Sequence, residues 1–221
     1  MIRIYLVRHG QTEENLQRIF QGHLPGVLTK EGRLQAVGLH AQLVNLPLDA
    51  VVSSDLQRVV DTVCLAFGGD SGIGTAVETE HAVKVEHAVE TEAESVAAFS
   101  LAGGKLDKTS VRGFLWHCGR KIPWERTRLL REIDWGSWTG LEIASVDTTK
   151  VPSDAESKEM LYERAGCFVK YLKRYYEGKT VLVVAHGLVN RSIQAQLEGV
   201  GIAHLHEVPH MKNAEIREFS V

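Results

Sequence analysis

The sequence has few cysteines, no long apolar run and no excess of one charge. Its three cysteines, Cys64, Cys118 and Cys167, are far apart and odd in number, which argues against a disulfide framework and fits a reducing compartment. Because no two cysteines are separated by only two residues, a zinc ribbon is not expected. No apolar run approaches the ~20 residues that span a bilayer, and residues 1–10 become charged too early for a signal peptide. We therefore expect a cytoplasmic protein with no membrane partner.

The charge balance argues against a nucleic-acid-binding protein. The formal net charge is -3, from 25 lysines and arginines and 28 aspartates and glutamates. Nucleic-acid-binding proteins usually carry a strong positive excess, so we expect no nucleic-acid partner. An anionic small molecule would need only a few cations in one cleft. With 44% hydrophobic residues among 221, the chain is long enough for one domain with its own core.

Short apolar runs alternate with helical patterns along most of the chain. The predicted strands are residues 2–7, 50–53, 180–185 and, at an edge, 213–221. Four helices are predicted. Two begin after Thr29 and Asp55, which can act as N-caps, and the other two cover residues 154–177 and 188–198. This order predicts an α/β fold in which helices cover both faces of a parallel sheet.

Residues 68–123 do not follow this order. Glycines open and interrupt the segment, and the sequence Ala-Val-Glu-Thr-Glu occurs twice in it, at 76–80 and 88–92. Alternating Val, Thr and His positions favour a strand, whereas the Ala and Glu content favours a helix. We therefore predict one domain over residues 1–221, interrupted at about 68–123 by an insertion that is either a flap or partly disordered.

Two predicted strands end in the same way. The first is followed by His9 and Gly10, and the strand at 180–185 is followed by His186 and Gly187. In an open α/β sheet, ligands bind beyond the carboxyl ends of the strands, and a glycine lets the backbone turn sharply beside a ligand. Either histidine alone is most simply a loop residue. The pair predicts that both imidazoles lie in one crevice.

Arginines and a carboxylate complete a set that suits phosphate chemistry. Arg8 precedes the first of these histidines, and Arg58 lies in the first turn of a predicted helix. Guanidinium groups bind phosphate oxygens bidentately; an exposed pairing with aspartates is the alternative for Arg58. Glu132 lies among tryptophans and glycines, and an apolar setting favours the protonated carboxyl that a general acid needs. The alternative for Glu132 is a salt bridge to Arg128 or Arg131.

Several motifs around these residues occur in a set order. They are Leu6-Val7-Arg8-His9-Gly10-Gln11-Thr12-Glu13-Glu14-Asn15, Gln21-Gly22, Leu28-Thr29-Lys30-Glu31-Gly32, Ser53-Ser54-Asp55-Leu56-Gln57-Arg58, Leu130-Arg131-Glu132, Trp138-Thr139-Gly140 and Ala185-His186-Gly187. This ordered set resembles the histidine phosphatase superfamily, the phosphoglycerate-mutase-like enzymes, over residues 1–67 and 124–221. Arg-His-Gly alone would be weak evidence, but the ordered set is specific.

The resemblance implies a role for each residue. His9 would be the nucleophile that forms a phosphohistidine, and Glu132 would protonate the leaving alcohol and then take a proton from water. Arg8, Arg58 and His186 would hold the phosphoryl oxygens and complete the catalytic set. The implied phosphate-binding residues are Arg8, Asn15, Gln21, Gly22, Arg58, His186 and Gly187. Because the arginines and His186 supply positive charge, the resemblance implies no metal and no cofactor.

The resemblance also implies a fold and an activity. The fold would be a three-layer sandwich with a mainly parallel central sheet, and the activity metal-independent hydrolysis of a small phosphorylated metabolite. The segment between Arg58 and Glu132 is longer than in small family phosphatases. The segment from Glu132 to His186 is shorter than in the glycolytic mutases, and Gln11-Thr12 stands where those mutases usually carry Glu-Ser. The short segment after Glu132 and the Gln11-Thr12 pair favour a phosphatase over a mutase, whereas the longer segment before Glu132 either caps the site or has no catalytic part.

Other functions are weighed against this one. A bisphosphoglycerate-dependent phosphoglycerate mutase would return the phosphate to another hydroxyl, and a non-catalytic protein would only bind a phosphorylated ligand. A metal site at His81, His87, His117 and Cys118 is disfavoured, because the spacing of its histidines suits neither a helical nor a finger-type site. The leaving group and the oligomeric state are not encoded in these motifs, and a homodimer stays open.

Overall fold

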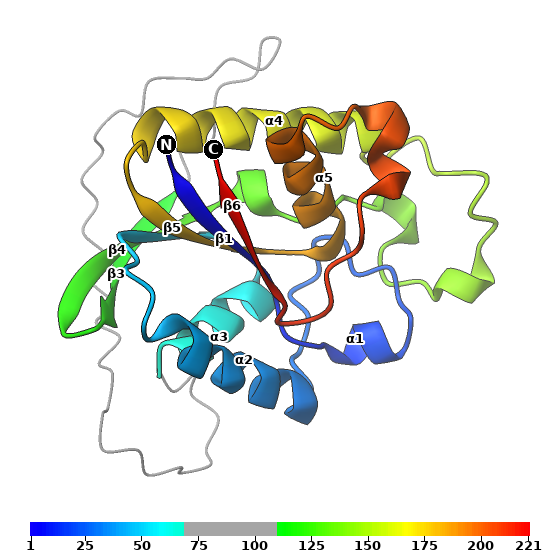
Figure 1. Ribbon diagram of the computed structural model, residues 1–221. Helices are drawn as coiled ribbons and strands as arrows, with labels where there is room; N and C mark the ends of the chain where they lie inside the picture. The colour runs from blue at the N-terminus through cyan, green and yellow to red at the C-terminus, as the bar shows by residue number, and fades with distance from the viewer. Residues whose placement is uncertain (69–109) are drawn as a thin grey trace.

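A six-stranded sheet forms the centre of the protein in the computed structural model, which describes residues 1–68 and 110–221 (Figure 1). The strands are β1 (Arg3–Arg8), β2 (Ala50–Ser54), β3 (Val111–His117), β4 (Arg120–Thr127), β5 (Thr180–Ala185) and β6 (Ile216–Ser220). Their order is β3-β4-β2-β5-β1-β6. The four inner strands are parallel, and β3 and β6 pair antiparallel at the edges. The predicted α/β fold with a mainly parallel sheet is confirmed.

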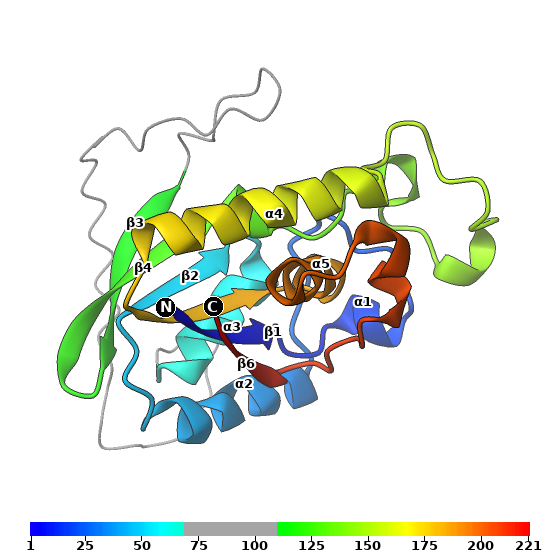
Figure 2. The ribbon, with the colours of Figure 1, turned by 45° about the horizontal axis from the view of Figure 1, so that its top comes forward.

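Helices cover both faces of this sheet. They are α1 (Glu13–Leu16), α2 (Lys30–Leu43), α3 (Gln57–Ala66), α4 (Lys158–Tyr175) and α5 (Gly187–Glu198). Short 3-10 helices, η1 to η4, cover Arg128–Leu130, Gly136–Trp138, Ile143–Ser145 and Ile202–Glu207. Helices α2 and α3 lie on one face, and α4 and α5 lie on the other (Figures 1 and 2). None of the helices in the described ranges is long and apolar enough to cross a membrane.

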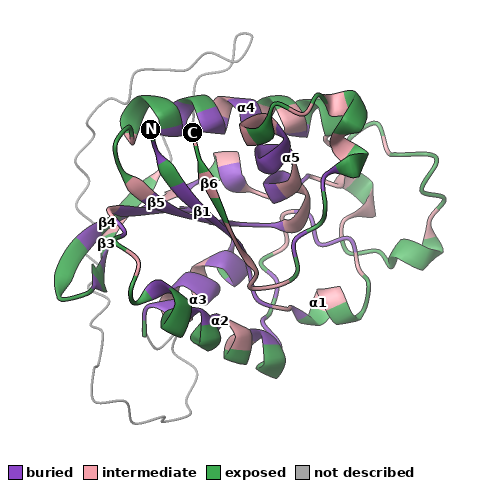
Figure 3. Ribbon diagram, viewed as in Figure 1, coloured by how far each residue is buried: buried purple, intermediate pink, exposed green. Residues whose placement is uncertain are grey.

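The core consists of two layers separated by the sheet (Figure 3). Because successive side chains of a strand point to opposite faces, Ile4 and Leu6 of β1 pack under α4 and α5, whereas Val7 packs toward α2 and α3. Strand β5 alternates in the same way, and all its positions after Thr180 are buried. A strand buried on both faces reads as a continuous apolar run, which is why β1 and β5 were visible in the sequence.

The predicted insertion at 68–123 is too long at its C-terminal end. Strand β3 and the first residues of β4 lie in the sheet, where they form an antiparallel hairpin that pairs with β2 through Trp124–Thr127. Residues 69–109 lie outside the described part of the chain.

Two local predictions about helices have opposite outcomes. Thr29 caps α2 as predicted, since its side chain accepts a hydrogen bond from the Gly32 N–H. The predicted cap of α3 is wrong: the N-cap is Leu56, without a side-chain bond. The Asp55 carboxylate instead accepts from Arg131, with Oδ1 2.7 Å from Nε. A distant arginine therefore competes with the local helix for this carboxylate.

Candidate active site

The two histidines lie side by side at the carboxyl ends of neighbouring parallel strands. Strands β1 and β5 pair directly, with Arg8 opposite Ala185, so the residues that follow them meet. The His9 and His186 rings lie with their centroids 5.2 Å apart, in an edge-to-face arrangement. Both side chains are buried. The structure therefore brings the two imidazoles together, as the sequence predicts.

The surroundings of His9 set its protonation state. Its Nδ1 lies 2.7 Å from the Gly10 carbonyl oxygen, and because a carbonyl only accepts, Nδ1 carries the proton and Nε2 keeps a free lone pair. Burial lowers the pKa of His9 well below its usual value, and the nearby charges of Arg58 and Arg8 lower it further. His9 is therefore a neutral imidazole at neutral pH, the form that can act as a nucleophile.

Close backbone packing holds the loop that carries His9. The Gly10 N–H donates to Thr62 Oγ1 at 3.1 Å, and the Thr62 hydroxyl donates to the Arg58 carbonyl. A Cβ at Gly10 would lie 2.4 Å from the Gly32 carbonyl oxygen, and a Cβ at Gly32 would lie 1.9 Å from the Gln11 carbonyl oxygen. Both positions need glycine because the loop and the start of α2 approach too closely for a side chain.

Arg58 and His186 form a buried pair. The Arg58 Nε donates to His186 Nδ1 at 3.1 Å, so His186 carries its proton on Nε2, which donates to Ser54 Oγ at 2.9 Å. Burial, followed by the charge of Arg58, holds the pKa of His186 well below its usual value. The remaining Arg58 nitrogens donate to the carbonyls of Gly22 and Leu24, and burial lowers the pKa of Arg58 to about 10.

Arg8 directs part of its guanidinium toward the start of α5. Its Nη1 donates to the Met211 carbonyl at 2.8 Å, whereas its Nε is buried without a hydrogen-bond partner among the described residues. A Cβ at Gly187 would lie 3.5 Å from Arg8 Cζ and 3.6 Å from Glu132 Oε2. The bare backbone at Gly187 thus lies between an arginine and the predicted acid. Burial lowers the pKa of Arg8, and the charges of Glu132 and Glu215 oppose that shift.

Glu132 reaches the same helix end from the loop after η1. Its Oε2 accepts from the Leu188 N–H at 3.1 Å, and its Oε1 accepts from the N–H groups of Val189, at 3.2 Å, and Ile133, at 3.0 Å. The N-terminus of a helix attracts negative charge, so α5 receives this carboxylate. The expected aromatic setting is wrong: the rings of Trp135 and Trp138 pack against Phe20, and the carboxylate accepts from amide donors instead.

The other predicted pocket residues form one network beside His9. Asn15 donates to Gln21 Oε1 at 3.4 Å, and the Gln21 amide donates to Thr12 Oγ1 at 2.6 Å. Gly22 has a positive φ of 48° and offers its carbonyl to Arg58. Asn213, which the sequence analysis missed, donates to the His9 carbonyl at 3.0 Å. Nothing in the tail sequence distinguishes that asparagine, since only the fold brings it to His9.

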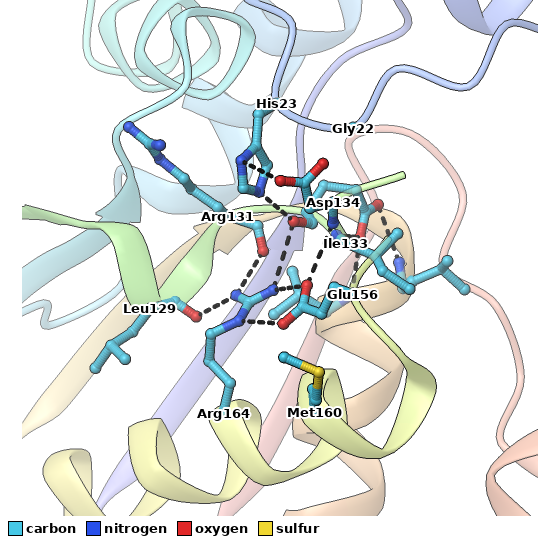
Figure 4. Close-up of polar contacts among 12 residues, drawn as sticks. Gly22, His23, Leu129, Arg131, Ile133, Asp134, Glu156, Met160 and Arg164 are labelled. Carbon is cyan, nitrogen blue, oxygen red and sulfur yellow. Dashed lines mark hydrogen bonds and ion pairs between the residues drawn. The ribbon is translucent and has the colours of Figure 1, made fainter. Parts of the chain in front are cut away.

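The described residues contain no group of three His, Cys, Asp or Glu side chains that could hold a metal ion. His117 instead has its Nε2 2.7 Å from the Leu46 carbonyl, and His81 and His87 lie outside the described part of the chain. A cleft of about 490 Å³ lies next to residues 131–135, which we call the acid loop because it carries Glu132. The cleft is lined in part by His23, Asp134 and Arg164 (Figure 4).

Comparisons with known proteins identify relatives of the chain. The family model described as "Histidine phosphatase superfamily (branch 1)" matches residues 4–83 and 115–221. The adenosylcobalamin/alpha-ribazole phosphatase of Salmonella typhimurium is 43% identical over 68 residues, which are 31% of this chain and 34% of the relative. The match therefore spans about a third of that curated relative.

Two further comparisons extend over nearly the whole chain. The 2,3-bisphosphoglycerate-dependent phosphoglycerate mutase of Streptococcus pneumoniae is 24% identical over 90% of this chain and 85% of its own. The crystal structure of the alpha-ribazole phosphatase from Shigella flexneri superposes with a TM-score of 0.68 at 18% identity, covering 99% of this chain and 90% of that chain. At such identity the superposition shows a shared fold.

Proposed function

The chain belongs to the histidine phosphatase superfamily, and within it we propose that the protein hydrolyses the phosphate monoester of a small metabolite through a phosphohistidine on His9. One observation carries the proposal: His9 is a buried, neutral imidazole whose Nε2 is unprotonated. A neutral imidazole beside two arginines can attack an anion that the arginines attract. The relatives named as phosphatases support hydrolysis.

The proposed reaction has two steps. His9 Nε2 attacks phosphorus, the bond to the ester oxygen breaks, and Glu132 gives its proton to the leaving alcohol. Glu132 then takes a proton from a water molecule, whose oxygen attacks phosphorus, and the bond to Nε2 breaks to release inorganic phosphate.

Positive charge for this reaction comes from the protein. Arg8 offers its unpartnered Nε and Arg58 a buried guanidinium, and the Gly187 amide at the start of α5 is proposed to add a donor. Asn15, Gln21 and Gly22 are proposed to line the phosphate pocket. His186 is proposed to contact a phosphoryl oxygen by turning its Nε2 proton to the substrate from Ser54, to which it donates in this structure. We accordingly propose that neither a metal ion nor a cofactor takes part.

The test is phosphate release from a panel of phosphomonoesters in the presence of a chelator, together with chemical trapping of the intermediate. We expect release to survive the chelator and the trapped phosphoenzyme to be acid-labile and alkali-stable, as a phosphorus–nitrogen bond is. His9→Ala should lower turnover by at least about 10³-fold, since it removes the nucleophile. The control is His204→Ala, which removes an exposed histidine. A His9→Ala variant with most of its activity would rule out the proposal.

A phosphoglycerate mutase is the second candidate, favoured by the pneumococcal relative that covers 90% of the chain. The same phosphohistidine would then return its phosphate to a second hydroxyl, which requires exclusion of water. Incubation with 3-phosphoglycerate and bisphosphoglycerate separates the two. Formation of 2-phosphoglycerate faster than inorganic phosphate would identify a mutase, and the absence of both reactions on every substrate would favour a non-catalytic phosphate-binding protein.

A further inference from the structure

Arg164 is outside the set of residues that the motifs single out, yet every nitrogen of its guanidinium has a partner around the acid loop. Its Nε and Nη2 bind the two carboxylate oxygens of Glu156 at 2.9 and 2.7 Å. Its Nη1 donates to the carbonyls of Leu129 and Arg131, both at 2.8 Å (Figure 4). Arg164 lies early in α4 and is 16% exposed. This guanidinium therefore links helix α4 to the acid loop through hydrogen bonds.

Glu156 bonds to the backbone of the same loop after Glu132. Its Oε2 accepts from the Asp134 N–H at 3.2 Å, and its own N–H donates to the Asp134 carbonyl at 2.8 Å. The two residues, which we call the Arg164–Glu156 clamp, thus bind backbone groups on both sides of Glu132. The Glu132 carbonyl itself lies 3.4 Å from Arg164 Nη2 and 3.0 Å from His23 Nε2.

No helix or strand fixes the backbone of this loop. Residues 131–135 belong to no helix or strand, so side chains must supply the hydrogen bonds that regular structure supplies elsewhere. A catalytic group must be held within about 0.5 Å of its working position, and a displacement of about 1 Å can cost 10²-fold in rate. The carboxyl of Glu132 can hold such a position only if its backbone is fixed.

We propose that the Arg164–Glu156 clamp is a positioning device for the general acid, with Arg164 as the specific positioning residue. The inference rests on the proposed function, in which Glu132 protonates the leaving alcohol. The planar fork of arginine binds a carboxylate and two carbonyls at once, whereas a lysine ammonium offers one compact charge. Arg164→Lys therefore keeps the charge and loses the geometry.

Arg164 also has an electrostatic route to the site, which the test must separate. Its charge contributes, after burial and closer charges, to the lowered pKa of His186. A charge effect on His186 would slow all substrates alike, because every phosphomonoester presents the same phosphoryl group. A misplaced acid would slow only those whose leaving group needs a proton. Since Arg164→Lys retains the charge, it isolates the second effect.

The experiment measures kcat/KM for an alkyl phosphate and for p-nitrophenyl phosphate, whose leaving group departs without a proton. For Arg164→Lys we expect a loss of about 10- to 100-fold on the alkyl phosphate, part of the 10²–10⁴ that a positioned acid supplies. On p-nitrophenyl phosphate we expect a loss below about threefold, because that reaction needs no acid. The ratio kcat/KM reports only steps up to phosphoenzyme formation, so the later water attack does not obscure it.

Matched variants guard against a general loss of structure. Arg174→Lys makes the same change on an exposed residue of α4 and should alter neither substrate. Glu156→Gln removes the negative charge of the clamp while keeping the shape of the side chain. It should lose kcat/KM selectively on the alkyl phosphate, as Arg164→Lys does. Equal losses on both substrates in Arg164→Lys and Glu156→Gln would mean a structural role and would overturn the inference.

A double-mutant cycle with Glu132→Gln gives the decisive comparison. If Arg164 acts through Glu132, adding Arg164→Lys to Glu132→Gln should slow the alkyl phosphate reaction no further. Additive losses would overturn the inference while leaving the proposed function intact. A Glu132→Gln variant without any selective loss on the alkyl phosphate would instead remove the acid role itself, and the inference would fall with it.

Discussion

His9 and His186 each follow a strand directly, whereas Glu132 lies in the irregular segment between β4 and α4. The backbone of the sheet holds the two histidines, since β1 and β5 pair in register up to the residues that precede them. The acid loop has no such pairing and depends on Arg164, Glu156 and the amides of α5. We call His9, His186 and the Arg58 bonded to it the strand-end half of the site, and Glu132 with its loop the acid half. Main-chain pairing and burial position the strand-end half, and a few side-chain contacts position the acid half.

This difference predicts that changes in the strand-end half affect stability and activity together. Among changes that leave both histidines in place, Arg58→Ala should have the largest effect, because Arg58 is fully buried and bonds to His186, Gly22 and Leu24. We expect kcat/KM to fall by at least about 10²-fold and the free energy of unfolding to fall by about 2–4 kcal/mol. Steady-state kinetics and urea denaturation measure the two.

Gln57→Ala is the control for Arg58→Ala, since Gln57 is the exposed neighbour in the same helix. It should change stability by no more than about 0.5 kcal/mol. If Arg58→Ala were as stable and as active as Gln57→Ala, the buried arginine would contribute neither to the site nor to the fold.

Two glycines of α2 give a sharper test of close packing. Gly32→Ala places a Cβ 1.9 Å from the Gln11 carbonyl oxygen, whereas a Cβ at Gly38 meets nothing within 4 Å. We expect Gly32→Ala to destabilise the fold by at least about 2 kcal/mol and to lower activity, since Gln11 adjoins the His9 loop. Gly38→Ala should stabilise by about 0.5–1 kcal/mol. Thermal and urea unfolding measure both, and equal outcomes would contradict the close approach.

The buried histidines predict a pH dependence of stability and activity. Their pKa values are lowered in the folded state, so below about pH 6.5 the unfolded chain binds protons that the folded chain does not. Stability should therefore be fully present above this pH and decrease as the pH falls, by up to about 1.4 kcal/mol per pH unit for each histidine. The kcat/KM for release should persist below pH 6.5, because His9 stays neutral there.

Urea denaturation between pH 5 and 8 measures this slope, and His9→Gln should reduce it because one of the two buried imidazoles is then absent. A slope unchanged in His9→Gln, or activity that already falls above pH 6.5, would contradict the lowered pKa of His9.

The smallest effect, on stability, is expected at the start of α4, the helix that follows the acid loop. Ser157 caps the helix by accepting from the Met160 N–H at 3.2 Å. Ser157→Ala should cost about 1 kcal/mol, and Ser157→Asp should retain the cap. Ser153→Ala, in the same irregular segment, is the exposed control. Thermal unfolding of the three variants measures the difference, and a loss in Ser157→Asp equal to that in Ser157→Ala would contradict capping.

The β3–β4 hairpin shows why part of the fold was not visible in the sequence. Most of β3 is exposed, so its apolar residues do not alternate as those of a half-buried strand do. Strand β4 contains Pro123, which argues against an inner strand. The structure tolerates this proline because the pairing with β2 begins only at Trp124. The interpretation of residues 68–123 as one insertion was therefore wrong at this end.

The sequence by itself determined the strand-end half of the site. Apolar runs that stop at His9 and His186 place both residues at one edge of a parallel sheet, because strand direction and side-chain period follow from short-range patterns. Tertiary structure alone decided the partners of Asp55, Glu132 and His9. These are Arg131, the amides of α5 and Asn213, all distant in sequence. Their contacts depend on how the chain folds back, which no local pattern encodes.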